Sequence, residues 1–129
     1  MAYVDKPYQE RVKIWCLECF GQEILNDKLE RVFRFIEEAL ELGQSLGLTK
    51  EQTDALVNYV FNREIGESKQ ELGGVMVTLA ALSVIHNLDM IEEAENELDR
   101  VWSKIDKIRD KHNSKPKDVL SALPGNLKQ

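Results

Sequence analysis

Three glutamates fall close together in the segment Phe35–Glu41, and a fourth, Glu71, follows thirty residues later near the start of a second apolar segment. Glu38 and Glu41 are three residues apart, and Glu37 and Glu41 are four apart, so in a helix each pair shares a face. A group of carboxylates beside apolar residues is costly unless a positive charge neutralises it. Because oxygen ligands suit hard divalent cations, the spacing favours a site for Mg²⁺ or Mn²⁺.

The same spacing also fits an acidic face in contact with water, because like charges three or four apart cost only a few tenths of a kcal/mol per pair. Two features favour a site. Glu71 lies on the most apolar predicted helix, where exposed surface is scarce, and Gly73-Gly74 follows directly. Each glycine inside a helix costs about 1 kcal/mol relative to alanine, so we expect another helix or a ligand to approach this backbone closely.

The segment Glu37–Glu41 resembles the EExxE motif of the MazG-like, all-α nucleoside triphosphate pyrophosphohydrolases, and residues 71–74 stand where that family has its ExxD motif. The resemblance covers roughly residues 26–112 in helix order and spacing. It implies cleavage of a nucleoside triphosphate between its α and β phosphates, in dimers or tetramers whose sites lie between helices. Glu37 would be a carboxylate that lies behind the metal ligands or orients the attacking water. Carried over by position, the metal ligands are Glu38, Glu41 and Glu71.

One position departs from the family's pattern, because Gly74 stands where the second motif has its aspartate. Mg²⁺ keeps several waters and needs only a few protein carboxylates, so three glutamates can still hold it. Glu67, one turn before Glu71, is a further carboxylate within reach. The sequence therefore leaves two functions open. One is a Mg²⁺-dependent nucleotide pyrophosphohydrolase, and the other is a catalytically weakened helical module that binds nucleotide or another partner.

Hydrolysis of a phosphoanhydride also needs positive side chains that hold the phosphates. The last predicted helix has basic residues at spacings of three and four, which would form one continuous stripe: Arg100, Lys104, Lys107 and Lys111. Lys104 lies in the middle of that helix, and we predict it as the catalytic lysine that faces the carboxylates. The alternative is a solvated face whose charges pair with Glu93 and Glu97.

The elements that must position these residues are all predicted to be helices. Start and stop signals place them at about 7–20, 27–46, 67–86 and 89–112, with a shorter helix that begins at Thr49. The signals include glycines at the ends and a capping box from Thr49 to Gln52. The predicted fold is all-α and four-helix-bundle-like with one extra short helix, in a single domain over 1–112. Residues 113–129 are predicted to form a polar tail.

The apolar patterns predict how these helices pack. Leu56, Val57, Val60 and Phe61 are expected to face inward from the short helix. The helix over 67–86 is apolar around most of its circumference, which is typical of a central helix. A single layer of neighbours cannot cover all of that surface, and an uncovered apolar face is normally an interface. We therefore expect a homodimer or homotetramer with this helix near a symmetry axis.

Composition narrows the partners. A net charge of −6 and a pI near 5.0 disfavour binding to a nucleic acid polymer, so the expected partner is a free nucleotide. No apolar run approaches the roughly 18 residues of a membrane span, and the first residues lack the apolar region of a signal peptide. Cys16 and Cys19 fit packed thiols in a reducing, cytoplasmic setting better than a zinc or redox site. Trp15 is either a core residue or, by the resemblance, a base-stacking one.

Overall fold

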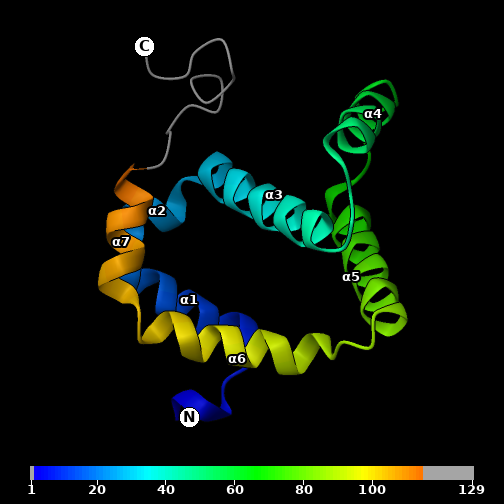
Figure 1. Ribbon diagram of the computed structural model, residues 1–129. Coiled ribbons are helices and arrows are strands. Elements are labelled where there is room, and N and C mark those ends of the chain that lie inside the picture. Colours follow the sequence, from blue (N-terminus) through cyan, green and yellow to red (C-terminus); the bar gives the residue numbers. More distant parts are fainter. Residues whose placement is uncertain (1, 115–129) are drawn as a thin grey trace. The chain divides into compact units, whose positions relative to one another are not determined.

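The computed structural model describes residues 2–114, and every regular element in that part of the chain is helical (Figure 1). The predicted tail lies outside the described residues except for 113 and 114, which continue the last helix. The elements are η1 (Tyr3–Asp5), α1 (Tyr8–Phe20), α2 (Gln22–Asn26), α3 (Lys28–Ser45), α4 (Lys50–Phe61), α5 (Ser68–Ile85), α6 (Met90–Trp102) and α7 (Ile105–Ser114).

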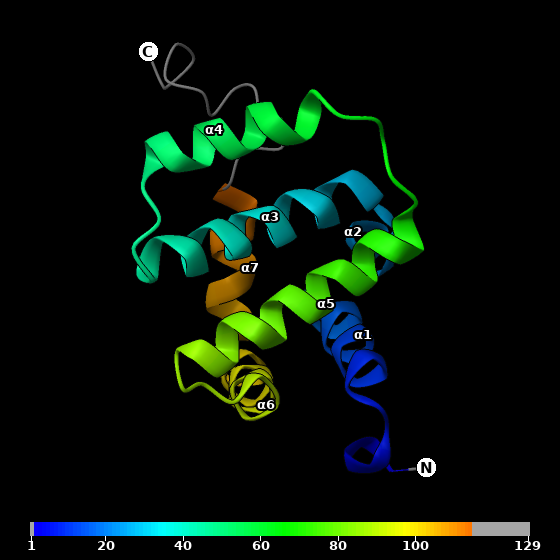
Figure 2. The same ribbon diagram turned by 90° about the vertical axis from the view of Figure 1, so that its right-hand side faces the viewer.

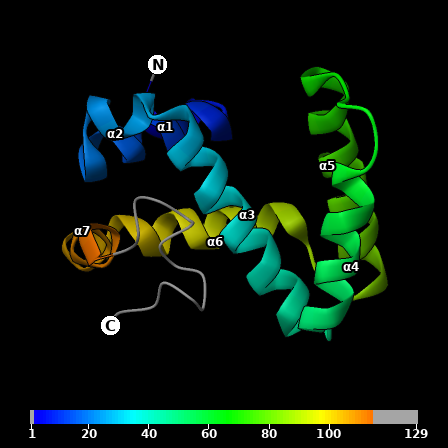
Figure 3. The same ribbon diagram turned by 90° about the horizontal axis from the view of Figure 1, so that it is seen from above.

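The chain divides into two compact units. The first, here called the terminal unit, combines residues 2–37 with residues 95–114. The second, here called the central unit, is Glu38–Ala94. The helix α3 is continuous across the first boundary and therefore contributes residues to both units (Figure 3). The candidate metal ligands belong to the central unit, whereas Glu37 and Lys104 belong to the terminal unit.

Most helix ends lie where the sequence predicts them. The backbone N–H of Glu30 donates to the side chain of Asp27, and that of Glu92 donates to Asp89, so both aspartates cap helices. Thr49 and Gln52 form the complete predicted capping box of α4. Gly21 and Gly47 end α1 and α3 with positive φ, a conformation that glycine adopts without steric cost.

The predicted single helix over 89–112 is wrong, because it is broken into α6 and α7 at Ser103 and Lys104. The Ser103 hydroxyl donates to the Arg100 carbonyl at 2.7 Å, and the backbone there makes short-range turn bonds instead of helical ones. The segment after the break packs on α1, where Arg109 donates to the carbonyl oxygens of Glu18 and Cys19 at that helix's C-terminus. The short helix α2 was also not predicted from the sequence.

The core of the terminal unit forms where α1 meets α2 and α7. Cys16 and Cys19 of α1 are buried in this unit, as is Leu98 of α6, and Trp15 and Phe20 meet edge to face with ring centroids 5.5 Å apart. Burial raises the pKa of both thiols above their ordinary value. Both cysteines are free thiols, so the prediction of two packed thiols is confirmed.

A buried ionic cluster supports the same core. Glu30 is only 5% exposed, and its carboxylate lies 2.9 Å from Arg34 Nε and 3.7 Å from Nδ1 of the buried His112 on α7. Arg31 Nη2 lies 3.9 Å from the same carboxylate, and its guanidinium stacks over the Phe20 ring. The cluster therefore ties the first turns of α3 to α7.

A two-bond ion pair joins α1 to α6 within the terminal unit. Both terminal nitrogens of Arg11 donate to the Glu95 carboxylate, at 2.7 and 2.6 Å. These hydrogen bonds hold the pKa of Glu95 below its ordinary value of 4.5. A carboxyl whose pKa is lowered by folding stabilises the fold above its unfolded pKa, and that contribution disappears as the pH falls through the lowered value.

We therefore expect Glu95→Gln to lower the melting temperature at pH 7 and to make progressively less difference as the pH falls from 4.5 towards 2. As the pH falls through the lowered pKa of Glu95, the wild-type carboxylate takes up a proton and loses its ion pair, so the two proteins converge. Thermal melts of both proteins, followed by circular dichroism across this pH range, measure the difference. An equal difference at pH 7 and at the acid end would contradict the assignment to Glu95.

The central unit differs from the sequence expectation in its packing. Leu56, Val57, Val60 and Phe61 do not pack inward but are between 48% and 83% exposed on α4. The apolar α5 is likewise exposed along most of its length, so within one chain it is not a central helix. Figure 2 shows α4 and α5 as two separate rods joined by the loop of residues 62–67. No single described helix is long and apolar enough to cross a membrane, and only the bent pair of α5 and α6 meets those criteria together.

Candidate functional site

The second half of α3 presents the first two candidate ligands. Glu38 and Glu41 are three residues apart on this helix, so their side chains leave the same face of the central unit. Glu41 lines a hollow of about 230 Å³. The other residues around it are Leu40, Gln44, Leu48, Thr49, Lys50 and Thr53.

The turn that closes this hollow follows from the sequence. Gly47 has a φ of +102°, which lets the chain reverse after α3, and the Leu48 N–H returns to the Gly43 carbonyl at 2.9 Å. The Leu48 side chain then packs directly on Gly43, where an added Cβ would come within 2.9 Å of it. Thr49 starts α4 immediately afterwards. The two glycines and the capping box therefore place the start of α4 beside Glu41.

Lys50 brings a positive charge to the same hollow. Its ammonium lies 2.8 Å from the Asp54 carboxylate one turn further along α4, and both side chains are exposed. An exposed pair of this kind contributes little to stability, so the lysine can exchange Asp54 for another anion at small cost. Sequence reasoning missed Lys50, although its position directly after the Thr49 cap was a usable signal.

The third candidate ligand, Glu71, lies in the first turn of α5. Its side chain folds back over Gly66 in the preceding loop, where an added Cβ would come within 3.0 Å of the Glu71 carboxyl carbon. Glu67 caps the same helix by accepting from the Gln70 N–H at 2.9 Å, so its carboxylate already has a structural role. Negative charge at a helix N-terminus is also favourable by itself. This stabilisation of α5 is an alternative explanation for a glutamate at position 71.

The donor set suits a hard cation. Carboxylate oxygens are what Mg²⁺ prefers, and one or two of them suffice when water and phosphate complete the coordination. Among the residues that the structure describes, no three side chains of His, Cys, Asp or Glu lie close enough together to hold a metal ion in this single chain. The spacing of Glu38 and Glu41 fits the need for one or two carboxylate ligands. Coordination of one Mg²⁺ by Glu38, Glu41 and Glu71 together stays a prediction.

Glu37 belongs to the terminal unit and is engaged there. Its carboxylate accepts from Arg34 Nη1 at 3.0 Å, one turn earlier on α3. Arg34 therefore lies between two carboxylates, because it also contacts Glu30. This pairing orients the Glu37 carboxylate, and its role beside the metal ligands or in orienting water stays a prediction.

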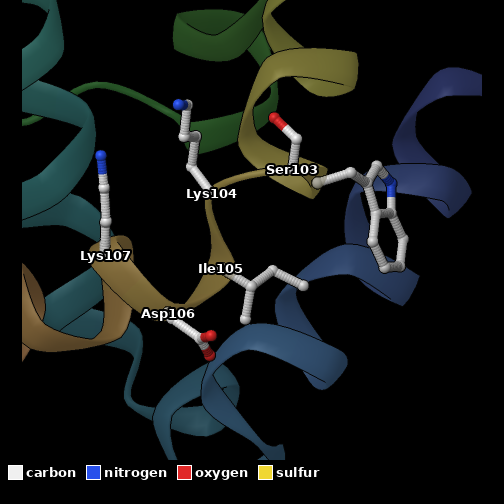
Figure 4. A pocket seen from close by; sticks show the side chains of 6 residues that line it. Ser103, Lys104, Ile105, Asp106 and Lys107 are labelled. Atoms are coloured by element: carbon white, nitrogen blue, oxygen red, sulfur yellow. The ribbon is translucent and has the colours of Figure 1, made fainter.

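Lys104 does not lie in the middle of a helix, because it falls at the break between α6 and α7. The break forms a hollow of ≈ 340 Å³ whose lining is drawn in Figure 4: Trp102, Ser103, Lys104, Ile105, Asp106 and Lys107. The figure shows Lys104 and Lys107 extending to one side of the chain and Asp106 to the other. The two lysines therefore still gather positive charge on one side.

The predicted continuous basic stripe is wrong for the same reason. Arg100 lies on α6 and forms a two-bond pair with Glu97, with distances of 2.8 and 2.7 Å. Arg109 lies on α7 and is bound to α1 carbonyl oxygens. Trp15 contacts Phe20 within the core and is only partly exposed, which favours its structural role over base stacking.

Comparisons with known proteins add nothing to this description. Neither the models of known protein families, nor the curated proteins, nor the solved structures contain a match to this chain.

Proposed function

We propose that this protein is a Mg²⁺-dependent nucleotide pyrophosphohydrolase that converts a nucleoside triphosphate to the monophosphate and pyrophosphate. The observation that carries the proposal is the pair Glu38 and Glu41 on one face of α3, with Glu41 at the edge of a hollow that also holds Lys50. The motif resemblance of Glu37–Glu41 supplies the reaction.

Each group has a part in that reaction. The carboxylates of Glu38 and Glu41 would hold the cation, with Glu71 as the third ligand. When bound, Mg²⁺ neutralises charge on the phosphates and polarises the bond that breaks. Glu37 would orient the attacking water, and Lys104 would hold the far phosphates. Lys50, beside Glu41, is placed to pair with a phosphate oxygen in exchange for Asp54.

The test is a screen for pyrophosphate release from a broad panel of unmodified and modified nucleoside triphosphates. Turnover of at least one nucleotide with Mg²⁺ or Mn²⁺, abolished by EDTA, is the expected result. Wild-type protein that releases no pyrophosphate from any of them would contradict the enzymatic proposal.

The second candidate function is a helical module that has lost catalysis and binds nucleotide or a partner. Gly74 favours it, because the open space around this residue accepts a side chain within one chain. Packing inside the chain therefore does not explain the glycine. Either a neighbouring chain approaches here, or the carboxylate of the family's motif has been lost.

Gly74→Asp separates the two functions. The new carboxylate would stand three residues after Glu71 on the same helical face, so we expect the Mg²⁺ concentration for half-maximal pyrophosphate release to fall about tenfold. Gly73→Asp is the matched control, because it makes the same change on a different face in equally open space.

Activity that appears only in Gly74→Asp would favour the weakened module as the natural function. Activity that is lost in Gly74→Asp and kept in Gly73→Asp would show that Gly74 makes room for something a carboxylate blocks.

A further inference from the structure

Gly66, in the loop before α5, differs from the glycines that end helices in what requires it. Gly21 and Gly47 have positive φ, whereas Gly66 does not, so left-handed backbone is not the reason for a glycine there. An added Cβ at Gly66 would instead collide with the Glu71 side chain, 3.0 Å from its carboxyl carbon and still closer to one carboxylate oxygen. The position therefore excludes a side chain because of Glu71 and not because of the turn.

This contact follows from how α5 begins. Glu67 is the N-cap, so Gly66 is the residue before the cap and Glu71 is the fourth residue of the helix. Side chains at these two positions meet in many helices, where an apolar pair fixes the direction of the incoming chain. Here the pair is a glycine and a glutamate, so it gives the helix no apolar contact of that kind. A carboxylate fills the space that a side chain at position 66 would take.

The Glu71 carboxylate has no polar contact within the chain that explains its place. Among the described residues, none donates a hydrogen bond to it and none forms an ion pair with it. The Glu67 carboxylate differs, because it accepts from the Gln70 N–H and is committed to the cap. The Glu71 side chain is also exposed. Its oxygens can therefore bind a cation from solvent without first giving up a contact within the chain.

We propose that Gly66 is a positioning residue that keeps open the place of the Glu71 carboxylate over the loop before α5. The inference rests on the proposed function, in which Glu71 is the third metal ligand. A side chain at position 66 would exclude this conformer of Glu71 and leave only those that direct the carboxylate elsewhere. A ligand that must be reoriented before it binds a cation binds it more weakly than one already in place.

Loss of this conformer should have little effect on the fold. The atoms that an added Cβ would meet all belong to the Glu71 side chain and none to the backbone, so the side chain can rotate away to another rotamer. Alanine in place of glycine also reduces the freedom of the unfolded chain. We therefore expect Gly66→Ala to keep the helical spectrum and to melt at the wild-type temperature or up to about 3 °C higher.

Binding of Mn²⁺ in the absence of nucleotide tests the effect on the ligand, because electron paramagnetic resonance detects the free ion directly. We expect Gly66→Ala to raise the dissociation constant for Mn²⁺ about tenfold, as when a residue that orients a metal ligand is disturbed. Gly73→Ala is the matched control, since it adds the same methyl group to another exposed glycine of the central unit, where nothing lies within 4 Å of the new Cβ. This control should bind Mn²⁺ as wild type does.

A double-mutant cycle separates positioning of Glu71 from a general effect on the loop. Glu71→Gln alone should weaken Mn²⁺ binding about tenfold, because it removes the charge that the cation requires. Gly66→Ala added to Glu71→Gln should weaken binding no further, because no carboxylate remains to be displaced. Losses that multiply to about 100-fold would show that Gly66 acts independently of Glu71 and would overturn the inference.

Crystal structures of metal-free wild type and Gly66→Ala test the placement itself. Glu71 should lie over the loop in wild type and turn away from it in the variant, with α5 beginning at Ser68 in both. A Glu71 side chain that keeps its place in the variant would overturn the inference, as would equal Mn²⁺ affinity in the two proteins or wild type that binds no Mn²⁺. Tenfold weaker Mn²⁺ binding in Gly66→Ala, with no pyrophosphate release by wild type, would contradict the proposed function and leave the inference standing.

Discussion

Replacing Glu41 with glutamine is expected to lower pyrophosphate release at least about 100-fold, equivalent to nearly 3 kcal/mol of lost transition-state stabilisation. Glutamine keeps the size of the side chain but removes the charge that a hard cation requires. Glu41 is exposed at the rim of a hollow and lies in the last turns of α3, so the helix and its glycine turn should be unaffected. The helical circular dichroism spectrum should therefore match that of wild type.

Glu64→Gln provides the control for this change. Glu64 is an exposed carboxylate in the loop after α4, in the same unit, and belongs to no part of the candidate site. The Glu64→Gln substitution removes the same charge from the protein and should leave nucleotide turnover and its Mg²⁺ dependence unchanged. An equal loss of activity in both variants would mean that activity depends on the protein's total charge and not on Glu41 as a metal ligand. Full activity in Glu41→Gln would show that Glu41 is not a ligand of the metal.

The sequence predicted the helix ends well, because a cap is a local interaction. Asp27, Thr49 and Asp89 each accept a hydrogen bond from a backbone N–H two or three residues later, and such contacts do not depend on the rest of the fold. The glycines after α1 and α3 follow the same logic, since a left-handed φ is a property of one residue.

The break between α6 and α7 could not be predicted, because its cause is partly distant in sequence. Ser103 gives a weak local signal, but serine occurs in many unbroken helices. The decisive contacts are those of Arg109 with the carbonyl end of α1, ninety residues away. The same break changes the position of Lys104, so an error in one helix boundary became an error in the candidate site.

Apolar periodicity predicts which face of a helix needs cover but not which chain provides it. The stripe of Leu56, Val60 and Phe61 has the spacing of an inward face and is exposed in one chain. The spacing of Glu38 and Glu41 is likewise fixed by α3 alone. The approach of Glu71 depends on how α5 is packed, which no local pattern in the sequence specifies.

Glu30→Ala is expected to destabilise the terminal unit by about 3 kcal/mol, the usual consequence of removing one partner from a buried ion pair. The Glu30 carboxylate is the shared ionic partner of Arg34 and, at longer range, of Arg31 and His112. Within the described part of the chain, Arg31 Nε and Nη2 are buried without a hydrogen-bond acceptor, and the guanidinium lies over the Phe20 ring. Removing Glu30 would take away the carboxylate that lies 3.9 Å from this guanidinium.

Guanidinium denaturation at one fixed protein concentration measures the effect, because association then contributes equally to every variant. Glu18→Ala on α1 is the control, since its exposed side chain should change the free energy of unfolding by no more than about 0.5 kcal/mol. Glu30→Gln separates charge from shape: a loss close to that of Glu30→Ala would assign the stabilisation to the ionic contacts. A variant as stable as wild type would mean that the arginines find water or other acceptors without cost, and that α7 is held by its contacts with α1 alone.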